Sequence, residues 1–268
     1  MPALAQSLPA SSLGEVQINA EAMEQLHALV VIQGGEERLA IAPRGPGLDR
    51  IANIKSVSKT IVALLTGIAI DRGHLSGPNA RVLPLLDRAE TGDARDSLTV
   101  GNLLSMQTGL ATTSGANYGA WVSSNDWVDY VLDAPAESRP GAFIYSTGGW
   151  HVLGALLARV TGRDLHNLAR NWLGDPLGVE IPRWYRDPQG LYLGGNQMGL
   201  TPRSLARIGE MVRRGGLWND TQVVPANWIE MSWQPRARSP WSGDQYGYGW
   251  FLTQIAGQEA AYGRGYGG

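Results

Sequence analysis

Apolar residues recur at helical spacing directly after the short stretch Ser56-Val57-Ser58-Lys59. A buried helix face is predicted by the positions Val57, Ile61, Leu64, Leu65 and Ile68. Gly73 supplies a C-terminal stop for this run. The pattern therefore predicts a buried helix with Ser56 in its first turn and Lys59 three residues further along the same face.

The remaining pattern predicts strands at both ends of the chain and helices between them. Residues 27–33 and 38–42 flank Gly34-Gly35-Glu36-Glu37 and predict a β-hairpin. Residues 111–119 are rich in Thr, Ser, Gly and Asn and are expected to form a loop, and residues 246–254 and 259–268 are expected to be strands. Capping and stop residues predict helices at 99–106, 126–132, 150–160, 165–173, 201–214 and 225–233.

This order of elements bears on the fold class. An order of strands, then many helices, then strands predicts an α/β (α+β) fold, with an antiparallel sheet flanked by helices and a mostly helical subdomain. The same order argues against a βαβ parallel sheet. The chain has no repeat and no flexible linker, so we expect residues 1–268 to form a single domain. Its α/β part would comprise about 20–90 and 200–268, and its helical part about 91–199. Because the chain stops inside a glycine-rich segment without a closing element, we expect the C-terminal end to be incomplete.

Composition excludes several classes of function. The 268 residues are 43% hydrophobic and 17% charged, which is typical of an ordinary globular protein. The formal charge of -2 gives no basic footprint for nucleic acid, and no segment approaches the length of a membrane span. The absence of cysteine excludes disulfides, cysteine nucleophiles and thiolate metal sites. Ala3-Leu4-Ala5 before Gln6 resembles a trimmed signal-peptide site, which predicts a periplasmic or secreted protein, with a cytoplasmic one as the alternative.

Lysine usage singles out the stretch at 56–59. Of the 22 basic residues only Lys55 and Lys59 are lysines, and lysine is the basic residue whose pKa shifts readily on burial. Burial and the positive end of the helix dipole both disfavour an ammonium, so Lys59 could take a proton from Ser56. The alternative is a surface lysine beside a capping serine, with the lysine stem lying along apolar surface.

Other chemical routes find little support. The sequence has neither a G-x-S-x-G nor an H-E-x-x-H motif, and its four histidines lack ligand spacing, so we expect no metal site and no cofactor. Residues 263–268 match G-x-G-x-x-G, but no helix follows them. Tyr145, in a small-residue turn and flanked by Ser146 and Thr147, is the best second proton carrier if a neighbouring cation lowers its pKa. The alternative is a core tyrosine after a turn.

Three stretches in this order resemble the serine hydrolases of the class C β-lactamase and DD-peptidase superfamily. They are S-V-S-K at 56–59, Y-S-T at 145–147 and G-Y-G-G at 265–268. The similarity extends to the stretches at 99–110, 126–132 and 140–148, so that it spans roughly residues 25–268. The resemblance implies a β-lactamase/DD-peptidase-like fold. It also implies Ser56 as the acylated nucleophile, Lys59 as its activating partner and Tyr145 as the acid/base.

The resemblance further implies an oxyanion hole and a set of substrate contacts. The hole would use the Ser56 N–H and an N–H on the terminal strand, which the motif alignment assigns to the residue after Gly268. Two departures concern recognition: Thr147 stands where many relatives have the Asn of Tyr-x-Asn, and Tyr266-Gly267-Gly268 replaces Lys/His-Thr-Gly. The loss of the Lys or His of this motif weakens recognition of a carboxylate on the substrate. It therefore favours the esterase and nylon-oligomer hydrolase branch of the superfamily. The candidate substrate-binding residues are Thr147, Tyr118, Tyr266, Gly267 and Gly268.

We therefore expect a serine hydrolase that forms an acyl-enzyme from small carboxylic esters or unstrained amides. Esters are favoured because their leaving group demands less acid assistance. A small-molecule ester or amide is the predicted partner, and the sequence carries no signal for an oligomeric state. One alternative is a β-lactamase or D-amino-acid peptidase. Another is a non-catalytic binding protein on the same scaffold, which the retained Lys59 and Tyr145 argue against.

Overall fold

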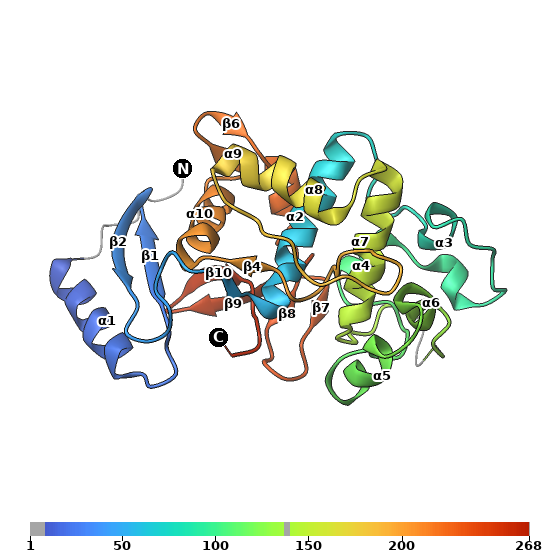
Figure 1. Ribbon diagram of the computed structural model, residues 1–268, viewed down its shortest axis with the longest axis horizontal. Helices are drawn as coiled ribbons and strands as arrows, with labels where there is room; N and C mark the ends of the chain where they lie inside the picture. Colours follow the sequence, from blue (N-terminus) through green and yellow to red (C-terminus); the bar gives the residue numbers. More distant parts are fainter. Residues whose placement is uncertain (1–8, 137–139, 268) are drawn as a thin grey trace.

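Helix α2 (Ser58–Asp71) runs through the centre of the molecule, with other elements packed around it (Figure 1). Its first twelve residues are buried, as the apolar pattern predicted, but it starts two residues after Ser56 because Lys55–Val57 form a 3-10 turn, η1. The structure is a computed structural model that describes residues 9–136 and 140–267. The small-residue stretch at 3–6 and Gly268 lie outside the described residues.

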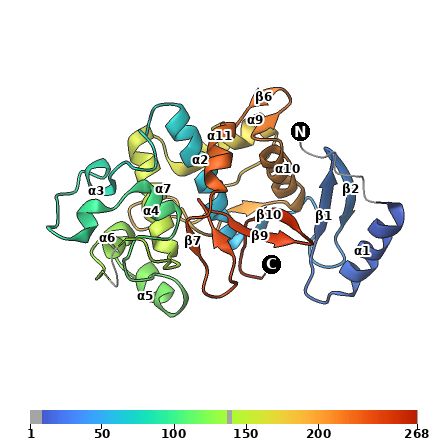
Figure 2. The same cartoon turned by 180° about the vertical axis from the view of Figure 1, so that it is seen from behind.

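The predicted hairpin is confirmed near the N-terminus. Strands β1 (Leu29–Gln33) and β2 (Glu36–Ile41) pair antiparallel around Gly34 and Gly35, whose φ angles of 64° and 89° lie in the left-handed region that a two-residue turn requires. Helix α1 (Ala10–Ala22) packs against β2 at one end of the molecule, where Figures 1 and 2 both show it.

The main sheet is formed by the C-terminal part of the chain. Its four antiparallel strands follow the order β10-β9-β8-β7. They are β7 (Ala237–Arg238), β8 (Gln245–Tyr246), β9 (Phe251–Ile255) and β10 (Gln258–Tyr262). The sheet lies behind α2 in Figure 1 and in front of it in Figure 2. Short antiparallel ladders join β3 (Ala52–Asn53) to β4 (Gly199–Leu200) and β5 (Leu217–Trp218) to β6 (Thr221–Gln222).

Helices fill the middle of the chain, and most of the predicted caps are confirmed. Thr99 forms a capping box with Asn102, and the Asp126 carboxylate accepts two helix N–H groups. The end opposite α1 is built largely by α3 (Val82–Leu85), α4 (Val100–Leu104), α5 (Tyr118–Val122) and α6 (Trp127–Leu132) (Figure 1). Tyr118, expected in a loop, is therefore the first residue of a short helix.

The longer helices pack around α2. Helix α7 (Thr147–Thr161) begins three residues before the predicted start, because Ser146 accepts the Gly149 N–H as its N-cap. The predicted helix at 165–173 is instead divided into α8 (Leu165–Ala169), a π-helical turn (Arg170–Gly174) and α9 (Asp175–Leu177). Helices α10 (Pro202–Arg213) and α11 (Ala226–Ser232) follow, and one continuous apolar core links α2, α4, α7, α8, α10 and α11 to β8 and β9.

The predicted strand at 259–268 is wrong beyond Tyr262. Residues 263–267 form coil and a turn. A Cβ at Gly263 would lie 2.9 Å from the Thr60 Oγ1, and one at Gly265 would lie 2.7 Å from the Ile54 carbonyl oxygen. These glycines therefore permit close approach of the chain to the start of α2, which is a different use of glycine from strand pairing.

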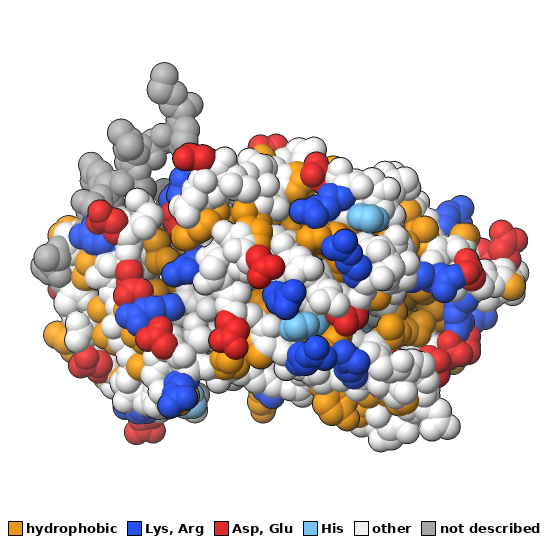
Figure 3. Space-filling model, turned by 45° about the horizontal axis from the view of Figure 1, so that its top comes forward, with side chains coloured by type: hydrophobic (Ala, Val, Ile, Leu, Met, Phe, Trp, Pro, Cys, Tyr) orange, Lys and Arg blue, Asp and Glu red, His pale blue; other side chains and the backbone are white. Residues whose placement is uncertain are grey.

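The surface carries both signs of charge. Figure 3 shows acidic and basic side chains interspersed over the face that comes forward there. Within residues 9–136 and 140–267, none of the helices combines the length and apolar character needed to cross a bilayer.

Candidate active site

Ser56 lies in a turn that is fixed from both sides. Lys55 adopts a left-handed φ of 49°, a strained conformation for a residue with a side chain, and its N–H donates to the Asn53 Oδ1 at 2.8 Å. The Ser58 hydroxyl donates to the Lys55 carbonyl at 2.6 Å and accepts the Met198 N–H at 3.2 Å. The start of α2 is thus tied to the segment around β4, and Ser56 is held half-buried at the helix N-terminus.

The amine of Lys59 points at this serine. Its Nζ donates to the Ser56 Oγ at 2.9 Å and to the Gly195 carbonyl at 2.6 Å, and lies 3.4 Å from the Thr147 Oγ1. The side chain is 2% exposed. All three of these acceptors are neutral oxygens.

Burial in neutral surroundings changes the acidity of the amine. It lowers the pKa of Lys59 from 10.5 to about 7, because desolvation penalises the ammonium. A large fraction of Lys59 is therefore unprotonated near neutral pH and can accept the hydroxyl proton of Ser56. This is the environment that the sequence pattern predicted for the lysine.

Tyr145 lies on the other side of Ser56. A hydrogen bond links the side chains of Ser56 and Tyr145, and the Lys59 Nζ lies 5.0 Å from the centre of the tyrosine ring. Burial raises the pKa of Tyr145 above its usual value, and the Ser56 bond and the charge of Arg264 offset this only in part. The condition that a neighbouring cation lowers this pKa is therefore not met, because the effect of desolvation outweighs that of the Arg264 charge. Tyr145 is a protonated phenol at neutral pH and suits the role of an acid.

Two short segments are joined residue by residue beneath these side chains. Residues 112–114 use their three hydroxyl groups to bind residues 145–147. The pairs are Thr112 Oγ1 to the Tyr145 carbonyl at 2.6 Å, Thr113 Oγ1 with Ser146 Oγ at 2.8 Å, and Ser114 Oγ with Thr147 Oγ1 at 2.9 Å. Ser114 also accepts the Thr147 N–H at 2.9 Å. These bonds fix the position from which Tyr145 and Thr147 reach the site.

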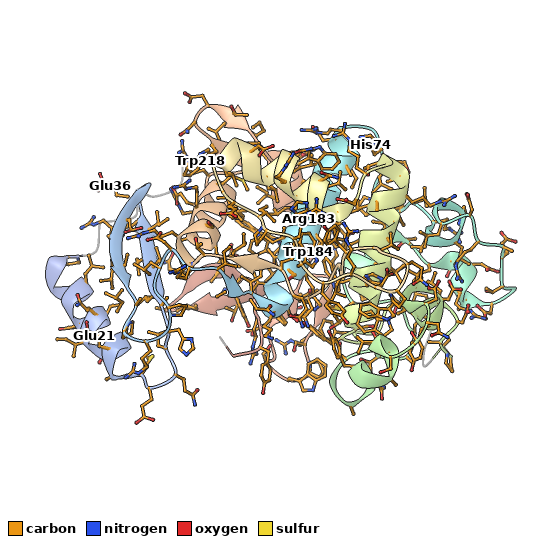
Figure 4. All side chains as sticks on the ribbon, viewed as in Figure 1. Glu21, Glu36, His74, Arg183, Trp184 and Trp218 are labelled. Atoms are coloured by element: carbon orange, nitrogen blue, oxygen red, sulfur yellow. The ribbon has the colours of Figure 1, made fainter. Side chains whose placement is uncertain are left out.

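The Gly195 carbonyl comes from the loop between α9 and β4, which crosses α2 and α7 in Figure 1. Figure 4 labels Arg183 and Trp184 on this loop, near the middle of the molecule. A Cβ at Gly194 would lie 2.3 Å from the Trp150 carbonyl oxygen, so the loop backbone rests directly on α7. A buried pair, His151 Nε2 with Asp187 Oδ2 at 3.0 Å, joins the same loop to α7 a second time.

Family membership follows from a comparison that covers nearly the whole chain. The model of the family described as Beta-lactamase matches residues 20–268. The chain belongs to the Beta-lactamase family. The resemblance inferred from the motifs at 56–59 and 145–147 is confirmed at this level.

One curated relative of this Beta-lactamase family chain has a low sequence identity to it. This relative, the 6-aminohexanoate-dimer hydrolase of Paenarthrobacter ureafaciens, is 24% identical over 223 residues, which are 76% of this chain and 56% of that protein. The chain thus spans little more than half the length of the curated relative it matches.

Solved structures show the same fold. An octameric penicillin-binding protein homologue from Pyrococcus abyssi gives a TM-score of 0.73 at 18% identity, covering 94% of this chain and 67% of that one. The D-amino acid amidase from Ochrobactrum anthropi SV3, complexed with L-phenylalanine, gives 0.69 at 17% identity, covering 89% and 78%. The predicted α/β fold of the β-lactamase/DD-peptidase type is confirmed.

The predicted substrate-binding residues of this family chain have different surroundings. Thr147 is next to Lys59, but Tyr118 packs edge-on against Trp121, with ring centres 5.5 Å apart. Tyr266 is 91% exposed at the end of the described chain, next to Gly267 in a turn, and Gly268 lies outside the described residues. In the described ranges, no group of three or more His, Asp or Glu side chains is arranged to hold a metal ion.

Three groups at the site were missed from the sequence. Ser114 supports Thr147, the Gly195 carbonyl accepts from Lys59, and Arg264 places a positive charge near Tyr145. Arg264 lies two residues before Tyr266, so a cation is present close to the place where the Lys/His of the family motif was thought to be lost. A backbone carbonyl has no signature in sequence, whereas the arginine between two glycines was a signal that could have been used.

Proposed function

We propose that this chain is the catalytic part of a serine hydrolase that forms an acyl-enzyme from small carboxylic esters or unstrained amides. The proposal rests above all on the buried amine of Lys59, 2.9 Å from the Ser56 hydroxyl and with a pKa of about 7. A non-catalytic scaffold gains nothing from an uncompensated buried amine, which costs folding free energy.

In acylation, the Ser56 Oγ attacks the carbonyl carbon of the substrate and its proton passes to the neutral Lys59 Nζ. The bond from that carbon to the leaving oxygen or nitrogen then breaks, and the leaving atom takes the phenolic proton of Tyr145. The proton on Lys59 returns the tyrosinate to a phenol. Together the two side chains carry one proton from the nucleophile to the leaving group.

Deacylation reverses these roles with water. A water molecule attacks the acyl carbon and gives its proton to the same Lys59–Tyr145 pair, and the Ser56 Oγ leaves and recovers a proton. The oxygen that becomes negative in both steps requires two N–H donors. We assign one to Ser56 and the other to the segment after β10, because Gly263 and Gly265 pass directly against the start of α2.

Two observations support this substrate class, the first for unstrained amides and the second for both amides and esters. The curated relative is a 6-aminohexanoate-dimer hydrolase, and one protein with the same fold is a D-amino acid amidase. The predicted acid, Tyr145, keeps its proton at neutral pH, which suits a leaving alkoxide or amide nitrogen that must be protonated.

The test is fluorophosphonate labelling of the full-length gene product, followed by peptide mapping. We expect one adduct, on Ser56, and none in the Ser56→Ala variant, whereas Ser97→Ala, at an exposed serine, should label like the wild type. Turnover of ester, amide and penicillin panels then identifies the class. Exclusive penicillin turnover would favour a β-lactamase, and a folded protein without any adduct would favour the binding-protein alternative.

A further inference from the structure

Trp241 is a large apolar side chain left in solvent beside the site. It is 73% exposed, although the other large aromatic rings around it are buried or half-buried. Its ring meets Tyr145 edge-on, with centres 6.2 Å apart and an interplanar angle of 80°, and meets Phe143 at 6.1 Å and 69°. An exposed tryptophan in contact with a predicted proton donor indicates a contact surface for substrate.

The turn that carries Trp241 is well anchored. It joins β7 to β8, and the Ser239 N–H donates to the Asp244 carbonyl at 2.9 Å while the Gly243 N–H donates to the Ser239 carbonyl at 3.0 Å. The Asp244 carboxylate accepts the Tyr262 hydroxyl at 2.6 Å, which ties the turn to β10. The indole is therefore presented from a fixed support, so that little ordering is needed when a ligand binds.

We propose that Trp241, together with Phe143, binds the leaving group of the substrate, and that the enzyme favours esters or amides whose alcohol or amine part carries a flat apolar ring. This inference rests on the proposed function. In that function Tyr145 gives its proton to the leaving atom, so whatever adjoins Tyr145 on the solvent side contacts the leaving group. The acyl carbon is attacked at Ser56, whose hydroxyl interacts with the Tyr145 phenol and accepts from Lys59 Nζ at 2.9 Å.

The chemistry of the surface defines the ligand. An indole with the edge of Phe143 beside it offers an apolar face without a charge, and aromatic pairs prefer offset-stacked or edge-to-face geometry. A benzyl or naphthylmethyl group matches this face, whereas a methyl group leaves it in water. We expect the ring to improve kcat/KM roughly tenfold over a small alkyl group.

Two ester series separate the leaving-group side from the acyl side. The first keeps the acetyl group and varies the alcohol among methyl, cyclohexylmethyl, benzyl and naphthylmethyl. The second keeps ethanol and varies the acid among acetic, butyric and phenylacetic. In Trp241→Ala we expect the preference for benzyl and naphthylmethyl acetates to disappear and the ratios within the second series to stay unchanged.

Three comparisons complete the test. Trp241→Phe should recover part of the ring preference, and Trp218→Ala, in strand β5 and labelled in Figure 4, should keep all of it. The alcohol has already left when the acetyl-enzyme is hydrolysed, so a residue that binds only the leaving group should not affect the deacylation rate constant, and this constant should not change in Trp241→Ala. An equal loss in both series, or a loss confined to the acyl series, would overturn the assignment of Trp241. Failure of the wild type to hydrolyse any ester or amide would instead contradict the proposed function.

Discussion

The charge of Lys59 depends on pH in the range where enzymes usually work. Its neutral oxygen partners orient the amine without compensating a positive charge, and burial then lowers its pKa to about 7. Arginine cannot serve as a base in the same position, because its guanidinium stays protonated. The choice of lysine at 59, in a chain that otherwise uses arginine almost throughout, therefore has a chemical reason.

Replacing this amine should remove most of the activity. For Lys59→Arg we expect kcat/KM to fall by roughly 10²- to 10⁴-fold, the usual contribution of a positioned acid or base. Steady-state hydrolysis of a simple ester measures the loss, with Lys55→Arg as the control at the other lysine. Near-normal turnover in Lys59→Arg would contradict proton transfer to Lys59.

The same amine sets the expected pH profile. Since only neutral Lys59 accepts the proton of Ser56, kcat/KM should rise with pH up to about 7 and then level off. The raised pKa of Tyr145 keeps the phenol protonated on the alkaline side, so the plateau should extend through pH 9. A series of ester kinetics from pH 5.5 to 9.5 measures the curve, and a flat profile would exclude Lys59 as the base.

Tyr145 should matter in proportion to the demands of the leaving group. In Tyr145→Phe we expect amides and alkyl esters to slow by roughly 10²- to 10⁴-fold, and activated nitrophenyl esters to slow much less, because nitrophenolate leaves without a proton. Rates for matched amide, alkyl ester and nitrophenyl ester substrates measure the difference. Equal losses for all three would assign Tyr145 to positioning instead.

At the scale of elements, the loop before β4 links the buried His151–Asp187 pair to Lys59. Asp187 Oδ1 also accepts the Leu191 N–H at 2.7 Å, so one carboxylate both closes the turn and binds α7. The Gly195 carbonyl follows a few residues later in the same loop and accepts from Lys59. The pair is thus positioned to hold the Gly195 carbonyl, which accepts from the Lys59 amine.

Removing the carboxylate should affect stability and activity together. Asp187→Ala leaves the buried His151 without its partner, which costs about 1–3 kcal/mol of unfolding free energy. It should also lower kcat and shift the pH midpoint set by Lys59. Glu210→Ala, which breaks the pair with Arg213 on α10, is the matched control and should lose stability with an unchanged pH profile. If the pH profile of activity were as unchanged in Asp187→Ala as in Glu210→Ala, the role of Asp187 would be structural only.

Many of the helices and strands could be predicted from the sequence, because the interactions that define them are local. The apolar spacing after Ser56, Gly34-Gly35 between two strands, and the cap at Thr99 each act within a few residues. The relation of Ser56 to Lys59 is local as well, because both lie within one turn at the start of α2.

The parts that could not be predicted depend on distant contacts. The Gly195 carbonyl is 136 residues from Lys59, and Ser114 is 33 residues from Thr147. The glycines at 263 and 265 suggest a glycine-rich strand until the close approach to Ile54 and Thr60 is seen. Tyr145 is a candidate that the sequence already offers, but the direction of its pKa depends on how deeply the fold buries it.

At the scale of the whole molecule, the buried amine affects folding as well as chemistry. The pKa of Lys59 is lower in the folded protein than its ordinary value of 10.5, so the unfolded chain holds the proton more tightly between pH 7 and 10.5. Stability should therefore rise with pH across this window, and the penalty should be fully present below pH 7. The shift corresponds to about 5 kcal/mol at most.

An apolar replacement should remove this penalty. We expect Lys59→Met to be inactive but more stable than the wild type at pH 7, with the difference shrinking as the pH approaches 10. Denaturant unfolding at pH 6, 7, 8.5 and 10 measures it, and Lys55→Met should keep the pH dependence of the wild type. A constant difference between Lys59→Met and the wild type across this range would contradict a lowered pKa.

The three hydrogen-bonded pairs between residues 112–114 and 145–147 share one offset of 33 positions, so they define a register, as paired strands do. The two ends of the segment between them, residues 115–144, are therefore fixed in space whatever the length of that segment. The described part of this segment holds α5 and α6, which form one wall of the helical end of the molecule. Insertions or exchanges within residues 115–144 can therefore remodel that wall while Tyr145 keeps its place, which makes this segment the natural point for grafting new specificity.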